Sequence, residues 1–293
     1  MRLGVLLMPT DGWPETVEQV QRLEAWGYHH VWVYDHLTWQ RYRDRPWHAT
    51  YPWLAGLAGA TSRIRLGTMV SNLNIRHPAV LAKDAMTIDH ISGGRVTIGL
   101  GAAGTGFDAT VLGQPELSSG QRVDRLAEAT RVLDGLLRGS LTNHSGQYYE
   151  LNEARVVPGC VQQPRLPLAI AAGGPRTLAV AAEFADAWIT YGDTSYKELS
   201  VEGTERVVRQ QAEMLEENCS RLGRDPRTLD RIYLIGNTEA KPLASVQAFE
   251  DFVGRYAELG FTDLVFHMPR ADDPVWHESP EIVEAIANTF LTN

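Results

Sequence analysis

The chain alternates between short apolar runs and longer stretches in which apolar residues recur with helical spacing. Strands of a parallel sheet buried on both faces read as continuous apolar runs, and each needs a crossover helix before the next strand can start. The runs that we interpret as strands are Leu3–Met8, His30–Tyr34, Ile64–Val70, Val96–Leu100, Leu168–Ala171, Ala187–Tyr191, Ile232–Ile235 and Leu264–His267. Helical spacing is clear at Thr16–Trp26, Val80–Ile91, Val123–Leu137, Arg176–Phe184, Glu205–Arg221, Ser245–Leu259 and Glu281–Phe290. This alternation predicts an α/β protein, a single (β/α)8 TIM-type barrel.

An open doubly wound sheet is the alternative arrangement of the same elements. Such a sheet carries a Gly-rich phosphate-binding turn after its first strand, and the sequence MPTDGWPE after the first apolar run does not supply one. Pro14, Pro78 and Pro175 lie near the predicted helix starts, where the missing N–H costs no hydrogen bond. We therefore favour the closed barrel.

The 293 residues fit one barrel domain over residues 1–293. The segment Gly139–Pro167, with the sequence SGQYYELNEARVVPG inside it, is too long for a plain connection between a helix and a strand. We interpret it as a short insertion hairpin near residues 139–167 and not as a second domain.

Composition narrows the functional class. A formal net charge of −9 argues against nucleic acid as a partner, because such binding needs a basic face. No apolar run reaches the roughly 20 residues of a membrane helix, and the start MRLGVLLMPTDG lacks the features of a secretory signal. We expect no membrane association and a cytoplasmic location. Cys160 and Cys219 are far apart and suggest no disulfide framework.

Motifs for metal-dependent or serine hydrolysis are missing from the sequence. The nine histidines contain neither H-x-H nor H-E-x-x-H, and no G-x-S-x-G elbow occurs. We expect no resident metal.

The first candidate site follows the second predicted strand. In a barrel of this kind the active site lies at the carboxyl ends of the strands, and Asp35 and His36 occupy that place. A carboxylate beside an imidazole can fix the tautomer of the ring and tune it for proton transfer. The alternative is a polar pair that only caps the following loop.

A second candidate site follows the fifth predicted strand, at Gly173, Gly174, Pro175, Arg176 and Thr177. Glycines let backbone approach a ligand, and the free N–H groups of a helix start favour an anion. Arg176 can add a charge-assisted contact. The alternative is an ordinary turn that needs glycine for its geometry alone.

Other residues near the mouth are weaker candidates. The Gly-rich run Gly99–Gly106, which includes Ala102, follows the fourth strand without the ending of a nucleotide P-loop and gives room for a flat ring. The loop LTWQRYRDRPWH mixes Trp39, Tyr42 and Trp47 with Arg41, Arg43 and Arg45, which suits a planar anionic ligand or a solvated rim. Arg76 is placed to reach a phosphate or an acidic tail, and His77 is interpreted as part of a helix start.

Three motifs together resemble the luciferase-like flavin or deazaflavin oxidoreductases. They are LGTMVSNLNIRHPAVLAKDAMTIDHISGGRVTIGLG at Leu66–Gly101, YDH at Tyr34–His36 and AAGGPRT at Ala171–Thr177. The resemblance implies a bulge at Met69, Val70, Ser71 and Asn72 against the cofactor ring, with a cis peptide bond between Met69 and Val70. It further implies ring contact by Ala102, phosphate binding by Gly173–Thr177, and a catalytic Asp35–His36 pair beside the ring.

Within that superfamily the chain looks most like the deazaflavin-dependent enzymes. The implied cofactor is coenzyme F420 (8-hydroxy-5-deazaflavin), and the implied reaction is hydride transfer between F420 and a small organic substrate. An FMN-dependent monooxygenase that uses O2 is the first alternative, and a non-catalytic flavin-binding protein is the alternative of another class. Gly104 stands where some deazaflavin dehydrogenases carry a glutamate proton donor, which weakens the case for a sugar-phosphate substrate. His36 is then the candidate proton donor, with Tyr191 or His267 next, and a homodimer is implied.

Overall fold

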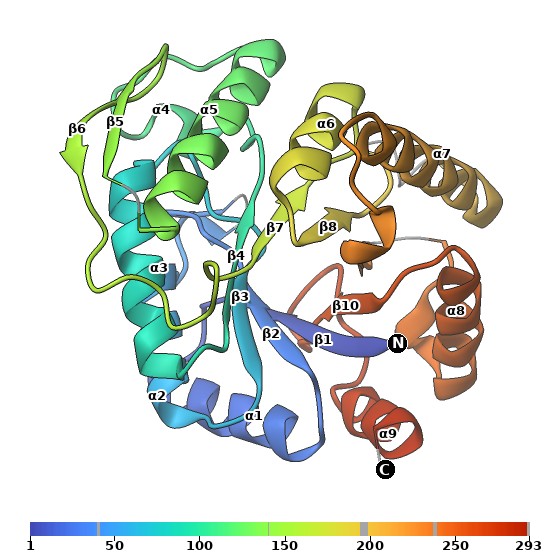
Figure 1. The fold of residues 1–293 in the computed structure, drawn as a ribbon. Helices are drawn as coiled ribbons and strands as arrows, with labels where there is room; N and C mark the ends of the chain where they lie inside the picture. Colours follow the sequence, from blue (N-terminus) through green and yellow to red (C-terminus); the bar gives the residue numbers. More distant parts are fainter. Residues whose placement is uncertain (40–41, 140, 194–198, 237–238, 292–293) are drawn as a thin grey trace.

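The protein is a closed barrel of parallel strands surrounded by helices (Figure 1). The computed structural model describes residues 1–39, 42–139, 141–193, 199–236 and 239–291. The barrel strands are β1 (Arg2–Leu7), β2 (His30–Val33), β3 (Arg65–Thr68), β4 (Val96–Leu100), β7 (Leu168–Ala171), β8 (Ala187–Thr190), β9 (Asp230–Leu234) and β10 (Asp263–His267). They pair in the order β1-β10-β9-β8-β7-β4-β3-β2, which closes on itself and confirms the predicted (β/α)8 barrel.

The helices cover the outside of this barrel (Figure 1). They are α1 (Trp13–Ala25), α2 (Thr50–Ala60), α3 (Pro78–Ser92), α4 (Phe107–Thr110), α5 (Ser119–Leu137), α6 (Pro175–Phe184), α7 (Val201–Arg221), α8 (Val246–Glu258) and α9 (Glu281–Phe290). Two of them, α2 and α4, were not among the predicted helices. The sequence of α2, TYPWLAGLAGA, carries no charged residue, so it lacks the polar face on which a helical period is recognised. α4 has only four residues.

The predicted insertion hairpin is present as β5 (Thr142–Ser145) and β6 (Glu150–Ala154), an antiparallel pair that lies beside α5 (Figure 1). Glu128 of α5 holds it in place. Its carboxylate accepts hydrogen bonds from the backbone N–H groups of Gln147, Tyr148 and Tyr149 and pairs with the His144 ring at 3.0 Å. Burial alone would raise the pKa of Glu128, but these hydrogen bonds outweigh it and the pKa is lowered.

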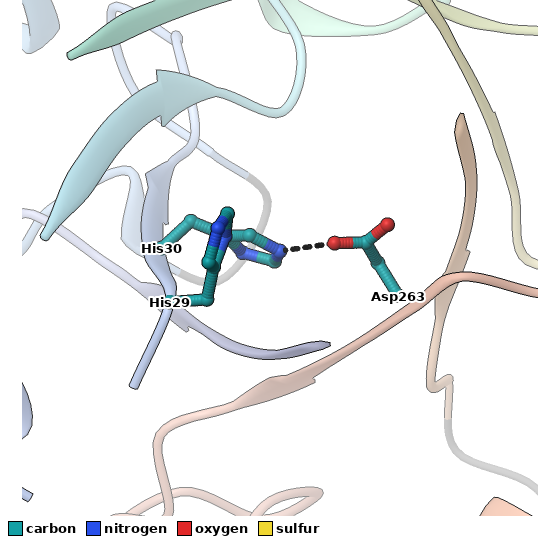
Figure 2. A group of neighbouring side chains, drawn as sticks. All are labelled: His29, His30 and Asp263. Carbon is teal, nitrogen blue, oxygen red and sulfur yellow. Dashed lines mark hydrogen bonds and ion pairs between the residues drawn. The ribbon is translucent and has the colours of Figure 1, made fainter. Parts of the chain in front are cut away.

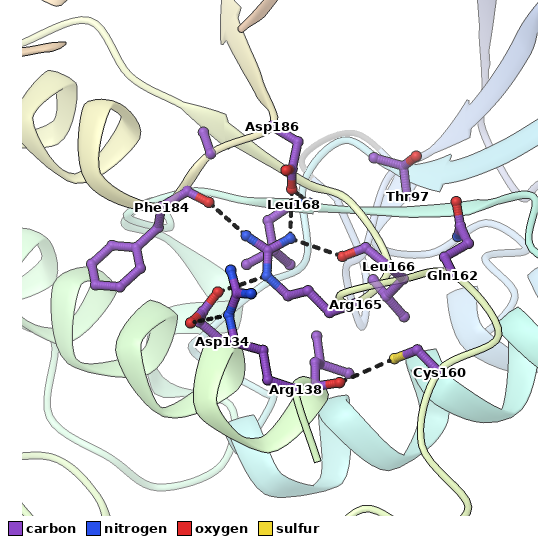
Figure 3. Close-up of polar contacts among 12 residues, drawn as sticks. Thr97, Asp134, Arg138, Cys160, Gln162, Arg165, Leu166, Leu168, Phe184 and Asp186 are labelled. Carbon is purple, nitrogen blue, oxygen red and sulfur yellow. Dashed lines mark hydrogen bonds and ion pairs between the residues drawn. The ribbon is translucent and has the colours of Figure 1, made fainter. Parts of the chain in front are cut away.

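The chain returns from the insertion to the barrel through a buried arginine, as Figure 3 shows. Arg165 is only 6% exposed. Its guanidinium donates to Asp134 of α5 at 2.6 Å, to Asp186 before β8 at 2.5 Å and to the Phe184 carbonyl at 2.8 Å. A buried guanidinium needs such partners for its charge and its donors. Arg165 therefore fixes α5, the end of α6 and the start of β8 relative to one another.

A second buried network lies where β2 and β10 begin (Figure 2). Within the described residues, His29, His30 and Asp263 bring potential metal-binding atoms within 4.8 Å of one another. Hydrogen bonds already use the His30 and Asp263 atoms: His30 Nδ1 accepts from Trp32 Nε1 at 2.6 Å, and His30 Nε2 donates to Asp263 at 3.0 Å, while His29 Nδ1 is buried without a hydrogen-bond partner among the described residues. Arg2 adds two donors to the same carboxylate, at 2.8 and 2.6 Å. We interpret the cluster as structural, since the amino-terminal face of such a barrel serves stability.

No helix in the described part of the chain is long and apolar enough to cross a membrane.

The Asp263 network gives a testable stability prediction. Burial alone would raise the pKa of Asp263, but hydrogen bonds from His30 and Arg2 outweigh it and lower the pKa to about 2. Against an unfolded value of about 3.9, the ionised carboxylate contributes roughly 2–3 kcal/mol at pH 7. That contribution is present above the unfolded pKa and falls to about half by pH 3. Urea unfolding of Asp263→Asn should therefore show a deficit of this size at pH 7 that shrinks toward pH 3.

Asp272, whose side chain is 78% exposed, provides the control. Asp272→Asn should change the free energy of unfolding by less than about 0.5 kcal/mol. A deficit in Asp263→Asn that stays constant between pH 7 and pH 3 would contradict the linkage.

Candidate active site

The predicted site residues gather at the carboxyl ends of the barrel strands. Tyr34, Asp35 and His36 follow β2, the bulge follows β3, and His267 ends β10. The peptide bond between Met69 and Val70 is cis, as expected from the family resemblance. These segments are far apart in the sequence and meet only because the parallel strands of the closed barrel end at one rim.

Two glycines, one in β4 and one directly after it, serve the packing of the bulge. A Cβ built on Gly101 would lie 2.8 Å from Val70 Cγ2, and one on Gly99 would lie 1.9 Å from the Thr68 carbonyl oxygen. These close approaches exclude a side chain. Gly99 and Gly101 therefore let β4 pack against the bulge, while Gly104 borders open space within the described residues.

The side chains of the bulge point in different directions: Met69 points into the barrel interior, and Ser71 contacts polar side chains. Met69 is buried in the interior cluster with Leu6 and Trp32. Ser71 is fully buried, and its hydroxyl bonds to Tyr51 at 2.7 Å and to Thr68 at 2.8 Å. The Ser71 backbone N–H also donates, to the Gly99 carbonyl at 2.8 Å, so Ser71 fixes the bulge to β4.

Asp35 does not act on His36, contrary to the expectation from the sequence. Its carboxylate is fully buried and takes two hydrogen bonds from the Arg76 guanidinium, at 3.0 and 2.8 Å. It also accepts from the backbone N–H of Asn72 at 3.0 Å. The same contacts engage Arg76, whose charge neutralises Asp35, and a phosphate contact of Arg76 stays a prediction. This buried pair fixes the bulge to the loop after β2.

His36 is paired instead with Asp108 of α4, which the sequence analysis missed. The His36 Nδ1 atom lies 2.7 Å from Asp108 Oδ2, and Asn72 Nδ2 lies 2.9 Å from the same oxygen. The one signal in the sequence is position, since Asp108 is the first carboxylate after the Gly-rich run that follows β4. Asp108 is 7% exposed and the His36 side chain 26% exposed, so the pair lies at the surface of the rim with the ring outermost.

Aromatic rings surround His36. Trp39 stacks on it with ring centres 5.9 Å apart and planes 21° apart, and Trp47 approaches it edge-on at the same centre distance. Trp39 also stacks on Tyr42. The cations of this loop are partly engaged: Arg43 lies over the Phe107 ring, Arg45 lies 3.6 Å from Asp272, and Arg41 falls outside the described residues.

The loop after β10 completes the rim. His267 Nε2 lies 2.7 Å from the Tyr34 hydroxyl, and the Trp276 ring covers His267 with centres 3.7 Å apart. Asp273 ties this loop to the one after β2, because it accepts from the Tyr42 hydroxyl at 2.6 Å and from the backbone N–H of Trp276 at 3.1 Å. Burial alone would raise the pKa of Asp273, but these bonds hold it well below its usual range.

The segment Gly173–Thr177 begins α6 with an open backbone. A Cβ on Gly174 would meet nothing within 4 Å. The Thr177 hydroxyl donates to the Gly174 carbonyl at 2.9 Å and accepts from the Gly174 N–H at 3.2 Å, which orders the turn. Arg176 forms an exposed ion pair with Asp124. The first turn of α6 therefore offers free N–H groups and a clear approach for an anion, as a cofactor phosphate requires.

Comparisons with known proteins agree with this architecture. Residues 1–279 match the family described as "Luciferase-like monooxygenase". An F420-dependent glucose-6-phosphate dehydrogenase of Beutenbergia cavernae is 29% identical over 87% of this chain and 87% of its own length. A 5,10-methylenetetrahydromethanopterin reductase of Archaeoglobus fulgidus is 30% identical over 64% of this chain, and the match spans about half of the relative (52%), as with several other curated relatives.

Solved structures share the fold. The coenzyme F420 dependent tetrahydromethanopterin reductase of Methanopyrus kandleri superposes with a TM-score of 0.75 at 19% identity, over 98% of this chain and 97% of that one. An F420-dependent secondary alcohol dehydrogenase in complex with an F420-acetone adduct gives 0.79 at 17% identity, over 97% and 98%. With the family match extending over nearly the whole barrel, the chain belongs to the luciferase-like monooxygenase family.

Proposed function

We propose that the protein is an F420-dependent oxidoreductase that transfers a hydride between F420 and a small organic substrate. The observation that carries the proposal is the match to an F420-dependent dehydrogenase over 87% of both chains. The rim supports it with a histidine hydrogen-bonded to a carboxylate after β2 and an open helix start for an anion after β7, both at the carboxyl ends of the barrel strands.

The chain offers a place for the ring and for the phosphate of the coenzyme. The phosphate would bind at the segment Gly173–Thr177, because this turn is open at Gly174 and its first turn carries no acidic residue. Pro175 has no N–H and the Gly174 N–H already donates to Thr177, so the N–H groups of Gly173, Arg176 and Thr177 would be the donors. The ring would lie against the bulge of Met69, Val70, Ser71 and Asn72 and beside Ala102, which is half-buried at the end of β4.

His36 would carry the proton in this reaction. Bound F420 supplies a hydride acceptor or donor at ring carbon C5. Oxidation of an alcohol releases a hydride from carbon and a proton from oxygen; the Nε2 atom of His36 would take that proton, and in the reverse direction it would return it. Asp35, fully buried and paired with Arg76, would serve the site by holding the loop.

FMN-dependent oxygenation is the second candidate for this site. A monooxygenase, RslO1 of Streptomyces bottropensis, has the same fold with a TM-score of 0.74 at 21% identity. FMN shares the tricyclic ring and the phosphate, so the same residues would suit it. A flavin-binding protein without catalysis is the third candidate, which the His36–Asp108 pair disfavours. We also keep as proposals that the chain forms a homodimer and acts in the cytoplasm, on the resemblance and composition given above.

The coenzyme itself gives the first test. Titration of the purified protein, followed by tryptophan fluorescence, should show F420 binding at least tenfold more tightly than FMN, a difference of about 1.4 kcal/mol. Tighter binding of FMN would instead favour the monooxygenase. Binding of neither coenzyme would refute the proposed function.

Gly174→Val tests the phosphate position. The side chain would enter open space, and the backbone at φ −105° and ψ 164° accepts any residue, so the fold should be kept while phosphate approach is blocked. We expect F420 affinity to fall at least tenfold, about 1.4 kcal/mol. Gly254→Val is the matched control, because a Cβ there also meets nothing within 4 Å and the residue lies on α8. Equal affinities in the two variants would place the phosphate elsewhere.

His36→Ala tests the proton transfer. We expect kcat to fall by about 10²–10⁴-fold, the usual effect of losing a general acid or base, while the Kd for F420 changes little. His90→Ala on α3, which lies outside the rim, should leave both unchanged. Loss of coenzyme binding in His36→Ala would assign His36 to binding, and normal turnover would make it a shape element only.

A further inference from the structure

A continuous chain of hydrogen bonds joins three loops at the rim. It runs from Arg76 to Asp35, from Asp35 to the Asn72 backbone, from the Asn72 side chain to Asp108, and from Asp108 to His36. The loops after β2, β3 and β4 each contribute to it. Guanidinium and backbone N–H groups can only donate, and ionised carboxylates can only accept. In a connected chain these fixed roles determine which atom of each remaining group donates and which accepts.

The orientation of the Asn72 amide follows from the backbone. The N–H of Asn74 donates to Asn72 Oδ1 at 3.0 Å, and a backbone N–H can only donate. The amide oxygen therefore faces Asn74, and the NH2 group faces Asp108. It follows that Asp108 Oδ2 accepts a hydrogen bond from Asn72.

The same oxygen then decides the tautomer of His36. An ionised carboxylate oxygen only accepts, so the contact at 2.7 Å needs a proton on His36 Nδ1. In the neutral ring the Nε2 atom is left with its lone pair. Among the described residues, Nε2 has no hydrogen-bond partner, and the ring is partly exposed at the rim. The basic nitrogen of His36 is thus the one that a substrate can reach.

We propose that Asp108 is the positioning residue of the reaction: it holds His36 as the Nδ1–H tautomer and directs Nε2 to the substrate proton. This inference rests on the proposed function and deepens it, since it assigns the orienting role to a residue on α4 and not to the neighbouring Asp35. Asp108 itself does not touch the reacting atoms. Its effect passes entirely through the imidazole of His36.

Burial supports a dedicated role for Asp108. Only 7% of the residue is exposed, and its second oxygen, Oδ1, is buried without a hydrogen-bond partner in the described part of the chain. An incompletely satisfied buried carboxylate opposes stability and is found where function requires it. Trp39 on one face of the His36 ring and Trp47 at its edge limit rotation, so the bond to Asp108 sets the direction of Nε2.

The tautomer can be observed directly in the full-length protein. In a sample with 15N-labelled histidine, long-range proton–nitrogen correlation spectra distinguish Nδ1–H from Nε2–H rings, and the His36→Ala spectrum identifies the His36 signals. We expect the Nδ1–H tautomer in the parent protein near pH 8. In Asp108→Asn and in Asp108→Ala we expect the Nδ1–H form to lose its majority. Asp44→Asn, an exposed carboxylate in the loop after β2, is the control and should leave the signals unchanged.

Kinetics with the coenzyme that binds completes the test. We expect Asp108→Asn to lower kcat by about 10²–10⁴-fold, as for a catalytic histidine left in the wrong tautomer. KM and the coenzyme Kd should stay within about threefold of the parent values, because a merely structural role would change affinity and stability instead. Asp108→Glu keeps the carboxylate and should recover part of kcat.

Several outcomes would overturn the inference. They are an Nε2–H tautomer in the parent protein, an unchanged tautomer in both Asp108 variants, and a changed tautomer with normal kcat. The spectra of the parent protein and of the variants need no coenzyme, so they test the role of Asp108 even if F420 does not bind. Failure of the proposed function would appear separately, in the coenzyme titration.

Discussion

A buried ion pair sets the geometry of the rim. Asp35 has no exposed surface, and a carboxylate in that position is strongly destabilising unless it is paired and fully hydrogen-bonded. Arg76 supplies the pair and the Asn72 N–H supplies a further donor. Because these partners come from the segment after β3, the loop after β2 is fixed to the bulge. His36 follows Asp35 directly, so its place depends on the same pair.

The two ends of the barrel have different tasks. At the amino-terminal end, Arg2, His30 and Asp263 hydrogen-bond to one another within the protein, and Arg165 is likewise hydrogen-bonded where the insertion rejoins β7. At the carboxyl end lie groups that form no hydrogen bond among the described residues: Asp108 Oδ1, His36 Nε2 and backbone N–H groups in the first turn of α6. The difference matches the expectation that one face of such a barrel supports the fold and the other carries the chemistry.

The sequence by itself determined the fold class and the candidate site segments. Apolar runs alternating with helical periods are enough to predict parallel strands with crossover helices, and the closed barrel has these strands in chain order except for the hairpin. The rule that sites lie at strand ends then selected Asp35, His36, Met69–Asn72 and Gly173–Thr177 without coordinates. The helix α2 was not predicted, because its sequence has no charged residue and so lacks the alternation of polar and apolar faces by which a helix is recognised.

Only the tertiary structure decided which of these groups act on one another. Adjacency in the sequence suggested that Asp35 orients His36, but successive residues at a strand end point in different directions, and Asp35 points to Arg76. The actual partner, Asp108, lies 72 residues away on a four-residue helix, in a place that depends on how β4 packs on the bulge. A hydrogen bond of this kind is set by the positions of three loops in space. Sequence periodicity predicts the type of each element and the face that it buries. The distance between side chains on different elements is set only by the closed barrel.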